Sequence, residues 1–508
     1  MENIDMLLKK DIEKSFNIRN KKKLFIFELA NNHNGSIDNG FILIRSAKKI
    51  SKSSNINFAI KLQFRDLKSF LYKKNRIKNK HIERFKSAKL SENEYSKLCK
   101  YIKKNNFTLV ITPFDEPSVS KAIKNKVDIL KIASCSNTDW PLIEKIAQTK
   151  KPVICSTGGL DIDGIDNICN FFNHKKIPLA ILHCISVYPT DDLKLFNLNF
   201  IKRLQLRYPN VIVGYSGHER EDNFLPVLTA SSLGARIFER HFSIFDSRNK
   251  YSADSKNLKE LISQLNSNIE LLGHENKKII SKKEVDSLNQ LRRGVFAKKN
   301  LSSKTKSLKK DVYFAFPKIN KKQLEPGDIS KQIKLTKNYK KDDALVTNKI
   351  DSNYEIIRKY VHRYKYMLNE ANVVISKDCR VELSHHNGIK NLEKVGALLV
   401  TLINGQYCKK VIALFPGQKH PKHKHFKKVE TFHMLWGDLQ IIKSNKIFNL
   451  TVGDKLDVFK DEWHSFSTKN GAVFEEISTE SIKSDSKYFD PVIDKTDSLV
   501  RKTLVPIW

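Results

Sequence analysis

The segment Leu24-Phe-Ile-Phe-Glu-Leu-Ala-Asn-Asn-His-Asn-Gly35 decides the fold of the first half of the chain. Its first six residues are apolar apart from Glu28 and show no alternation of polar and apolar positions, which is typical of a strand buried on both faces. Small and polar residues follow at once, from Asn31 to Gly35. Other apolar runs further along the chain end in the same way, so this segment is the first unit of a repeated pattern.

Eight such runs alternate with longer amphipathic stretches between Leu24 and about Leu272. The expected strands are Leu24–Leu29, Asn57–Gln63, Thr108–Phe114, Ile129–Ser134, Pro152–Thr157, Leu179–Ser186, Val211–Ser216 and Arg236–Phe242. Helical periodicity fills the gaps, for example at Trp140–Thr149 and Asn257–Leu272. The glycine-rich turn of an open dinucleotide-binding sheet is missing after the first strand. We therefore predict the α/β fold class, with a (β/α)8 TIM barrel over residues 24–280.

The remaining residues are expected to form four smaller parts. Residues 1–23 form an N-terminal extension, 285–350 a small β-rich module, and 351–372 a linker helix. Strand-like runs separated by glycine turns recur in residues 373–508, which predicts a β-sandwich or β-barrel domain there. These runs are Ala397–Ile403, Lys410–Phe415, Thr431–Trp436 and Leu439–Lys443.

The composition excludes several classes of protein. The 508 residues carry a formal net charge of +37, but the lysines are spread evenly, so we expect small anionic substrates and no nucleic acid. No apolar run approaches the roughly 18–20 residues of a membrane span, and residues 1–23 lack the apolar core of a secretory signal. The seven cysteines include no C-x-x-C pair. We therefore expect a cytoplasmic protein with reduced thiols and no membrane partner.

Cationic and hydroxyl side chains lie at the expected carboxyl ends of the barrel strands, where barrels build their catalytic sites. They are Lys61, Thr112, Lys131, Ser134, Ser156 and Ser216. Two ammonium groups that face one barrel mouth repel each other unless an anion lies between them. A molecule with both a phosphate and a carboxylate, such as phosphoenolpyruvate, would supply that charge. The alternative is that the two lysines extend separately to solvent.

Two histidines, His218 and His241, come at the ends of neighbouring expected strands. Such a pair could hold a divalent ion with open coordination positions, able to polarise a carbonyl group. The alternative is a pair of hydrogen-bonded core histidines. Glu28 is an anion within an apolar strand and needs a partner there, either a substrate hydroxyl or amine or a structural lysine.

With these residues in place, residues 24–272 resemble the sialic acid synthases (N-acetylneuraminate synthases), which condense phosphoenolpyruvate with an N-acetylated amino-sugar aldehyde. The phrases that carry the resemblance are Glu28-Leu-Ala-Asn-Asn-His-Asn-Gly35, Lys61-Leu-Gln63, Thr112-Pro-Phe-Asp115, Lys131-Ile-Ala-Ser134, Ser156-Thr-Gly158, His183-Cys-Ile-Ser-Val-Tyr-Pro189, Gly214-Tyr-Ser-Gly-His218 and Glu239-Arg-His-Phe242. Residues 285–350 resemble the antifreeze-like (SAF) domain that such synthases carry. The resemblance also implies a homodimer, in which this module covers the neighbour's barrel.

The resemblance implies a role for each matching residue. Catalytic roles would fall to Glu28, Lys61, Lys131, His218 and His241. Of these, the two histidines would bind the metal, usually Mn²⁺, and Glu28 would contact the sugar near its aldehyde. Substrate binding would fall to Gln63, Thr112, Ser134, Ser156, His183, Tyr188 and Ser216.

Four positions depart from the family pattern. Ser136 stands where the family has Glu in Ser-Gly-Glu, and Gly217 stands where it often has Asp. The family's Pro-Asp-His after the eighth strand corresponds here to Asn249-Lys-Tyr251. In the antifreeze-like module, Phe316 precedes a proline at the position of a substrate-binding arginine. The condensation itself tolerates these changes better than acceptor recognition does, so the acceptor is not fixed as N-acetylmannosamine.

The C-terminal region carries a second, independent signature. The residues that fit the two cupin motifs by their spacing are Gly417, His423, His425, Glu430, Gly437, Gly453 and His464. Strand alternation places His423 and His425 on one face, and Glu430 and His464 would reach the same ion from neighbouring strands. Three histidines and one carboxylate suit Mn, Fe, Ni or Zn. The alternative is a metal-free cupin with solvated histidines.

More narrowly, residues 373–490 resemble cupins of the D-lyxose isomerase type. The phrases are Gln406-Tyr-Cys-Lys-Lys-Val411, Phe415-Pro-Gly-Gln-Lys-His420 and Glu475-Glu-Ile-Ser-Thr479. In such an enzyme, a divalent ion binds adjacent sugar oxygens while a carboxylate, here Glu475 or Glu476, moves the proton. A sugar-binding or non-catalytic module is the alternative.

We therefore predict a cytoplasmic transferase that condenses phosphoenolpyruvate with an N-acetylmannosamine-like aldehyde to give a sialic or other nonulosonic acid and phosphate. The first alternative is a related synthase that uses a phosphorylated aldose. The second is a sugar-binding or regulatory protein without turnover. In the third, the cupin is the main catalyst, an isomerase that feeds the barrel.

Overall fold

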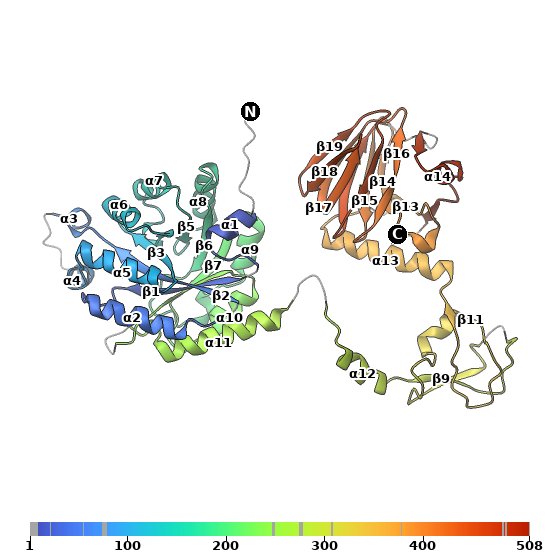
Figure 1. Cartoon of the computed structure of the whole chain (residues 1–508), viewed down its shortest axis with the longest axis horizontal. Coiled ribbons are helices and arrows are strands. Elements are labelled where there is room, and N and C mark those ends of the chain that lie inside the picture. The colour runs from blue at the N-terminus through green and yellow to red at the C-terminus, as the bar shows by residue number, and fades with distance from the viewer. Residues whose placement is uncertain are drawn as a thin grey trace. The chain divides into compact units, whose positions relative to one another are not determined.

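The computed structural model describes the chain except for residues 1–8, 21, 54, 74–78, 246–248, 274–277, 306–307, 377, 480–481, 483–484 and 507–508. Two compact units make up the chain, Met1–Lys278 and Ile279–Trp508. Among the described residues, the first unit holds a closed barrel and the second holds antiparallel sheets (Figure 1).

Eight parallel strands close the barrel, and each pairs with the next in chain order until β8 pairs with β1. The strands are β1 (Lys23–Ala30), β2 (Ile56–Phe64), β3 (Thr108–Pro113), β4 (Ile129–Ile132), β5 (Val153–Ser156), β6 (Leu179–Cys184), β7 (Ile212–Gly217) and β8 (Ile237–His241). The predicted (β/α)8 barrel is confirmed, and the strand ends differ from the prediction by one or two residues.

Helices surround the barrel and cover the outer faces of its strands (Figure 1). They are α2 (Ile37–Ile50), α5 (Glu92–Lys104), α6 (Glu116–Lys124), α7 (Trp140–Gln148), α8 (Ile162–His174), α9 (Phe200–Arg207), α10 (Leu225–Ser232) and α11 (Ser255–Leu272), with α3 (Leu67–Phe70) and α4 (Lys80–Ser87) between β2 and α5. Local chemistry fixes where they begin. Ser91, for example, starts α5 with a capping box in which it and Glu94 each bond the other's backbone N–H.

One end of the barrel interior is filled with apolar side chains. Helix α1 (Lys9–Ser15) and the turn after it place Ile12, Phe16 and Ile18 among inward-facing strand residues such as Leu24 and Ile26. These strand residues lie toward the amino-terminal ends of the strands, so the helix closes that end. The described part of residues 1–23, expected as an extension, therefore belongs to the barrel core. The polar residues are left at the opposite, carboxyl-terminal end.

The second unit begins with α12 (Lys282–Gln290) and two small antiparallel sheets. The first sheet pairs β9 (Gly294–Ala297) with β10 (Val312–Ala315), and the second pairs β11 (Gln332–Ile333) with β12 (Lys349–Ile350). A small core that includes Val295 and Leu345 lies between them. Helix α13 (Asn353–Glu370), the expected linker helix, buries Tyr364 in the core of the sheet that follows, so it is part of that domain.

An antiparallel β-domain follows α13. Its strands are β13 (Arg380–Ser384), β14 (Ala397–Asn404), β15 (Cys408–Leu414), β16 (Lys419–His425), β17 (Glu430–Lys443), β18 (Lys446–Thr451), β19 (Lys455–Val458), β20 (His464–Ser467), β21 (Ala472–Ser478), β22 (Ser486–Tyr488) and β23 (Lys502–Val505), with helix α14 (Pro491–Lys495) near the end. The prediction of two separate strands at residues 431–443 is wrong, because β17 runs through both. Its first half pairs with β21 and its second half with β20 and β18, so one strand joins two parts of the sheet.

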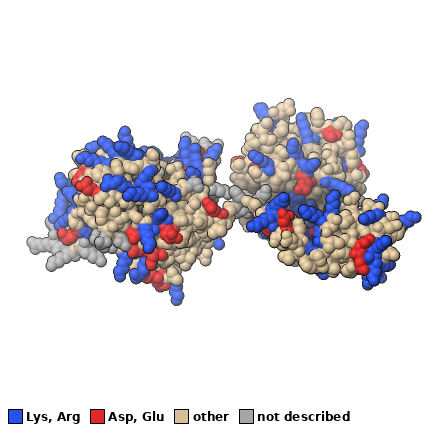
Figure 2. Space-filling view, turned by 60° about the horizontal axis from the view of Figure 1, so that its bottom comes forward, with Lys and Arg blue, Asp and Glu red and all other residues tan. Residues whose placement is uncertain are grey.

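Charged side chains are distributed over the surface. Figure 2 shows lysines and arginines over both parts of the visible face, with acidic side chains between them. Among the described residues, no helix is both long enough and apolar enough to span a membrane.

Candidate active site and candidate metal centre

Lys61 and Glu28 are neighbours toward the carboxyl-terminal end of the barrel. They are directly opposite each other in the β1–β2 pairing and form an ion pair. Lys61 Nζ also lies 2.8 Å from Oε1 of Glu239, on β8. All three side chains are buried. The sequence allows two kinds of partner for Glu28, a substrate group or a structural lysine, and in the structure its partner is Lys61.

Glu239 gathers cationic and hydroxyl groups from several strands. Its Oε1 lies 3.4 Å from Lys131 Nζ and accepts a hydrogen bond from Ser216 Oγ at 3.1 Å. Lys131 Nζ in turn donates to Ser156 Oγ at 2.8 Å. Lys61 and Lys131 therefore share one anion, and that anion is a carboxylate of the protein itself.

Glu239 is not among the site residues predicted from the sequence, although it lies in one of the polar strand-end phrases. A signal was present, because an acidic residue within an apolar strand needs a buried partner. The same reasoning selected Glu28. Applied to β8, it would have selected Glu239 as well.

Burial and ion pairing oppose each other in this cluster. Burial lowers the pKa of Lys131 and outweighs the attraction of Glu239. Burial also acts to lower the pKa of Lys61, but Glu239 and Glu28 outweigh it, so that pKa is raised. Burial acts to raise the pKa of Glu239, yet Lys131 and Lys61 hold it below its ordinary value. Lys61 and Glu239 are thus fixed in their charged forms at neutral pH.

His218 and His241 lie side by side, the first directly after β7 and the second at the end of β8. Their ring centroids are 5.4 Å apart. Nδ1 of His218 lies 2.9 Å from the carbonyl oxygen of Ile185 and so carries the proton, which leaves Nε2 with a free lone pair. Burial, followed by neighbouring positive charge, lowers the pKa of both imidazoles to about 3. Both are therefore neutral near neutral pH, the form that binds a metal ion, so the pair fits the divalent ion that we predict.

The other predicted binding residues lie around this cluster at different distances. Gln63 Nε2 donates to Glu28 Oε2 at 3.4 Å, a long bond. Thr112 Oγ1 is buried and has no hydrogen-bond partner among the described residues, so it is available to a ligand. Ser134 Oγ lies 3.6 Å from Cys184 Sγ.

Two predicted residues are placed differently from the lysines. His183 is buried, and its Nε2 donates to the carbonyl oxygen of Phe196 at 2.7 Å, which ties it to the backbone after β6. Tyr188 is half exposed, and its ring centroid lies 4.2 Å from that of His218. Tyr188 therefore belongs to the surroundings of the histidine pair, whereas His183 holds a loop.

The structure gives a physical reason for one departure from the family pattern. A Cβ at Gly217 would lie 2.6 Å from Glu219 Oε1, closer than real carbon atoms approach. The Glu219 carboxylate thus occupies the space of a side chain at 217. The other three departures lie in different places. The ring centroid of Tyr251 lies 5.0 Å from that of His241. Phe316 is exposed on the small module, and Ser136 is buried in a short turn.

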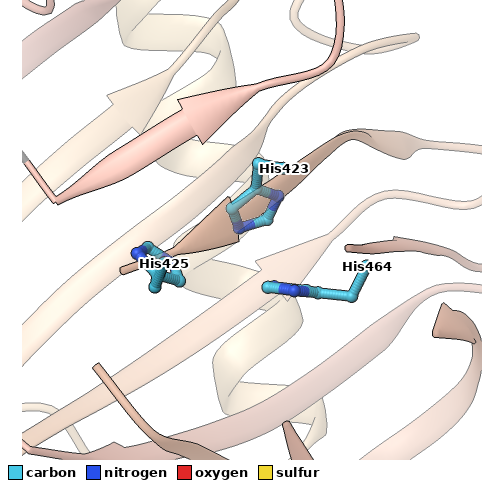
Figure 3. Close-up of side chains that lie close together, drawn as sticks. All are labelled: His423, His425 and His464. Atoms are coloured by element: carbon cyan, nitrogen blue, oxygen red, sulfur yellow. The ribbon is translucent and has the colours of Figure 1, made fainter. Parts of the chain in front are cut away.

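Three histidines form a second cluster in the C-terminal β-domain. His423 and His425 come from β16 and His464 from β20, and one nitrogen from each lies within 4.8 Å of the others. Figure 3 shows the three rings turned toward a common space. Alternation along β16 puts the first two on one face, as predicted, and the β16–β20 pairing brings the third opposite them.

Glu430 completes a four-residue arrangement. Its carboxylate oxygens lie 3.4 Å from Nε2 of His425 and 3.3 Å from Nε2 of His464. Nδ1 of His464 faces the carbonyl of Glu462 at 3.1 Å, and Nδ1 of His423 faces that of Pro421 at 2.9 Å. Such outer contacts fix the tautomer and leave Nε2 for a metal ion. The four residues therefore fit a divalent ion by their chemistry.

A buried lysine, missed by the sequence reasoning, adjoins this centre. Lys428 Nζ lies 2.5 Å from Glu430 and 2.5 Å from Glu476, whose carboxylate also lies 3.0 Å from Lys410. Glu476 is buried. Glu475, the other predicted proton carrier, points to the opposite face of β21, where it pairs with Lys409. Of the two acids, Glu476 is the one linked to the proposed metal centre, because Lys428 contacts both Glu476 and Glu430.

Two further buried histidines, His420 and His386, lie beside this cluster. His420, outside the cupin spacing, is buried, and its Nε2 lies 3.2 Å from that of His386. The His420 ring centroid is 4.8 Å from that of His423. His433, also outside the spacing, faces Glu475 instead. The cluster thus extends toward β13 but not toward His433.

Comparison with known proteins places the barrel in a family. Residues 50–277 match the NeuB family. A pseudaminic acid synthase from Campylobacter jejuni is 30% identical over 329 residues, which cover 61% of this chain and 90% of that protein. An uncharacterized protein of Methanocaldococcus jannaschii is 34% identical over 327 residues, covering 62% and 90%. The chain belongs to the NeuB family.

A solved structure agrees with this membership. The crystal structure of a putative spore coat polysaccharide biosynthesis protein E from Chromobacterium violaceum has 36% sequence identity and a TM-score of 0.61, over 64% of this chain and 98% of that chain. The NeuB match itself ends at residue 277, so the three-histidine cluster lies outside it.

Proposed function

We propose that the barrel condenses phosphoenolpyruvate with an amino-sugar aldehyde, similar to N-acetylmannosamine, to give a sialic or other nonulosonic acid and phosphate. One observation carries the proposal. Two buried lysines, from β2 and β4, converge on the Glu239 carboxylate, on the strand that also carries His241. The similarity to a pseudaminic acid synthase supports the same reaction class.

In this reaction, C3 of phosphoenolpyruvate attacks the aldehyde carbon, water adds at C2, and phosphate leaves with cleavage of its C–O bond. Lys61 and Lys131 would bind the phosphate and carboxylate and stabilise the charge as it shifts. Ser156 offers a hydroxyl group beside Lys131, and the buried Thr112 hydroxyl has no hydrogen-bond partner among the described residues. A divalent ion, Mn²⁺ by the family resemblance, would be held by His218 and His241 and would polarise the acceptor carbonyl.

The charge of the acceptor sugar separates this reaction from its alternative. A phosphorylated aldose, the alternative acceptor, needs a second anion pocket, which an uncharged sugar does not. The exposed Phe316, at the position of the family's substrate-binding arginine, means that the acceptor is not fixed as N-acetylmannosamine itself. We infer an uncharged 2-acylamino sugar as acceptor. Assays with unphosphorylated and phosphorylated sugars distinguish the two acceptors, because we expect the unphosphorylated sugar alone to raise phosphate release.

The test is binding of phosphoenolpyruvate by calorimetry with matched lysine variants. K131M removes a buried ammonium group that faces Glu239, whereas K259M removes an exposed lysine on α11. We expect K131M to lose measurable binding and phosphate release, and K259M to keep both. Equal binding by K131M and wild type would contradict the proposed site. Binding by wild type without phosphate release, with any acceptor, would favour a non-catalytic sugar-binding protein.

We also propose that residues 373–508 form a cupin whose His423, His425, Glu430 and His464 hold a divalent Mn, Fe, Ni or Zn ion. The arrangement suits aldose–ketose isomerisation, in which the ion would bind adjacent sugar oxygens and Glu476 would move the proton. We expect H423A to abolish isomerisation of a test aldose and to leave phosphate release intact. Loss of both activities would contradict two independent sites.

A further inference from the structure

A buried trio of side chains, Tyr215, Glu219 and Arg240, lies behind the histidine pair of the barrel. Their exposed fractions are 1%, 0% and 0%, which makes them as buried as the apolar core. Arg240 and Glu219 form an ion pair, and the Tyr215 hydroxyl donates to Glu219 Oε2 at 2.9 Å. We call these three residues the Arg240 clamp. None of them belongs to the substrate site described above.

The clamp joins the two segments that carry the proposed metal ligands. Glu219 directly follows His218, and Arg240 directly precedes His241. Along β8, alternation turns Glu239 and His241 to the barrel interior and Arg240 to the other side. Arg240 thus reaches the segment after β7 without entering the substrate site.

The clamp also connects the two segments beyond the point where the backbone pairing of β7 and β8 ends. The β7–β8 register runs through Ser216–Glu239 and ends with Gly217–Arg240, one residue before His218 and His241. Beyond that point, Nη2 of Arg240 donates to the carbonyl oxygens of Glu219 at 3.2 Å and of residue 220 at 3.1 Å. Side-chain hydrogen bonds therefore hold the His218 segment where the ladder has ended.

Glycine at position 217 is part of the same arrangement. A Cβ there would lie 2.6 Å from Oε1 and 2.8 Å from Cδ of Glu219. The carboxylate can reach Arg240 and Tyr215 in this position only because residue 217 has no side chain. The sequence Gly217-His218-Glu219 is thus matched to Arg240 on the next strand.

We propose that Arg240 and Glu219 are positioning residues of the barrel site. The buried pair fixes the His218 segment against the end of β8 and so sets the separation of the two imidazoles. The proposal rests on the proposed function in one respect, that these imidazoles bind a divalent ion. Partners behind metal-ligating histidines typically change metal affinity 10- to 100-fold when they are altered.

The test compares R240K with R236K in the full-length protein. Lysine keeps the charge at position 240 but cannot donate to two carbonyl oxygens in Arg240's planar fork. Arg236 is a matched control at the other end of β8, because it also bonds two backbone carbonyls and a glutamate, those of Ile18, Lys22 and Glu13. Hydrogen exchange of residues 217–222 is measured for both variants, and Mn²⁺ affinity is measured with H423A/H464A also present, so that the barrel site alone is titrated.

We expect R240K to speed exchange in residues 217–222 and to weaken Mn²⁺ binding about 10- to 100-fold, while R236K changes neither at a comparable loss of thermal stability. E219A should act like R240K, and G217D/E219A should recover part of the affinity by placing a carboxylate in the same space. Wild-type exchange or wild-type Mn²⁺ affinity in a folded R240K protein would overturn the proposal. If the wild type binds no Mn²⁺ in the barrel, the proposed function fails, whereas the exchange data still decide whether the clamp holds the segment.

Discussion

At the scale of single residues, the barrel site depends on the charge balance around Glu239. One carboxylate oxygen lies 2.8 Å from Lys61 and 3.4 Å from Lys131, and all three groups are buried. Paired, these charges offset part of one another's desolvation cost. Without Glu239, two ammonium groups would face each other at low dielectric.

We therefore expect E239Q to destabilise the barrel by about 3–5 kcal/mol, the usual cost of removing one partner of a buried pair. Urea unfolding at neutral pH measures it. The matched control is D166N, because Asp166 forms an ion pair with Arg207 at the surface, where the loss should be about 0–1 kcal/mol. Similar losses in the two variants would show that the charges of Lys61 and Lys131 are not compensated mainly by Glu239.

The same carboxylate predicts a dependence of stability on pH. Its pKa is lower in the folded protein than in the unfolded chain, because Lys131 and Lys61 outweigh the effect of burial. The folded state therefore binds fewer protons, and this contribution is complete above the ordinary glutamate pKa and is lost as pH falls below it. We expect the difference in unfolding free energy between wild type and E239Q to shrink between about pH 5 and pH 3. A difference that stays constant over that range would contradict the assignment.

At the scale of elements, close strand contacts hold the residues in register. Gly214, on β7, has no room for a side chain, because a Cβ there would lie 2.5 Å from Leu182 Cδ2 and 3.0 Å from the carbonyl carbon of Ile237. Both neighbours belong to adjacent strands, and backbone cannot move as freely as a side chain. The spacing of β6, β7 and β8 thus depends on this glycine.

We expect G214A to lower stability by about 1–3 kcal/mol, the usual cost of overpacking. Thermal unfolding followed by circular dichroism measures the loss. Gly327, which has open space around its Cβ position, supplies the control variant G327A. If G214A unfolds at the wild-type temperature, the strands tolerate a wider spacing than we infer.

The elements also show what the sequence can and cannot predict. Continuous apolar runs gave all eight barrel strands, because burial on both faces leaves a local signal. The single strand β17 appeared as two, because Gly437 and polar residues interrupt its pattern while its pairing partners are distant in sequence. Long-range partners were missed for the same reason. No local sequence pattern near Lys428 predicts Glu476 as its partner, and none near Glu219 predicts Arg240.

At the scale of the whole molecule, the chain has two compact units, each with its own histidine cluster. The barrel pair would leave open coordination positions, whereas the C-terminal cluster offers three histidines and a carboxylate. Their ligands belong to different units, so we expect the two sites to be loaded independently.

Metal analysis of purified variants tests this independence. We expect two divalent ions per wild-type chain, and one each in the double variants H218A/H241A and H423A/H464A. Mass spectrometry under native conditions gives the count, and circular dichroism confirms that each variant is folded. Loss of both ions in either double variant would show that the sites are coupled.

The most direct test of the central claim is mass spectrometry of products formed from phosphoenolpyruvate, Mn²⁺ and a set of 2-acylamino hexoses with the full-length protein. We predict a new sugar acid, heavier than its acceptor by one pyruvate unit, together with one phosphate per product, and neither from K131M. The contradicting result is no such product from any acceptor, while a pseudaminic acid synthase assayed in parallel with its own substrate forms one.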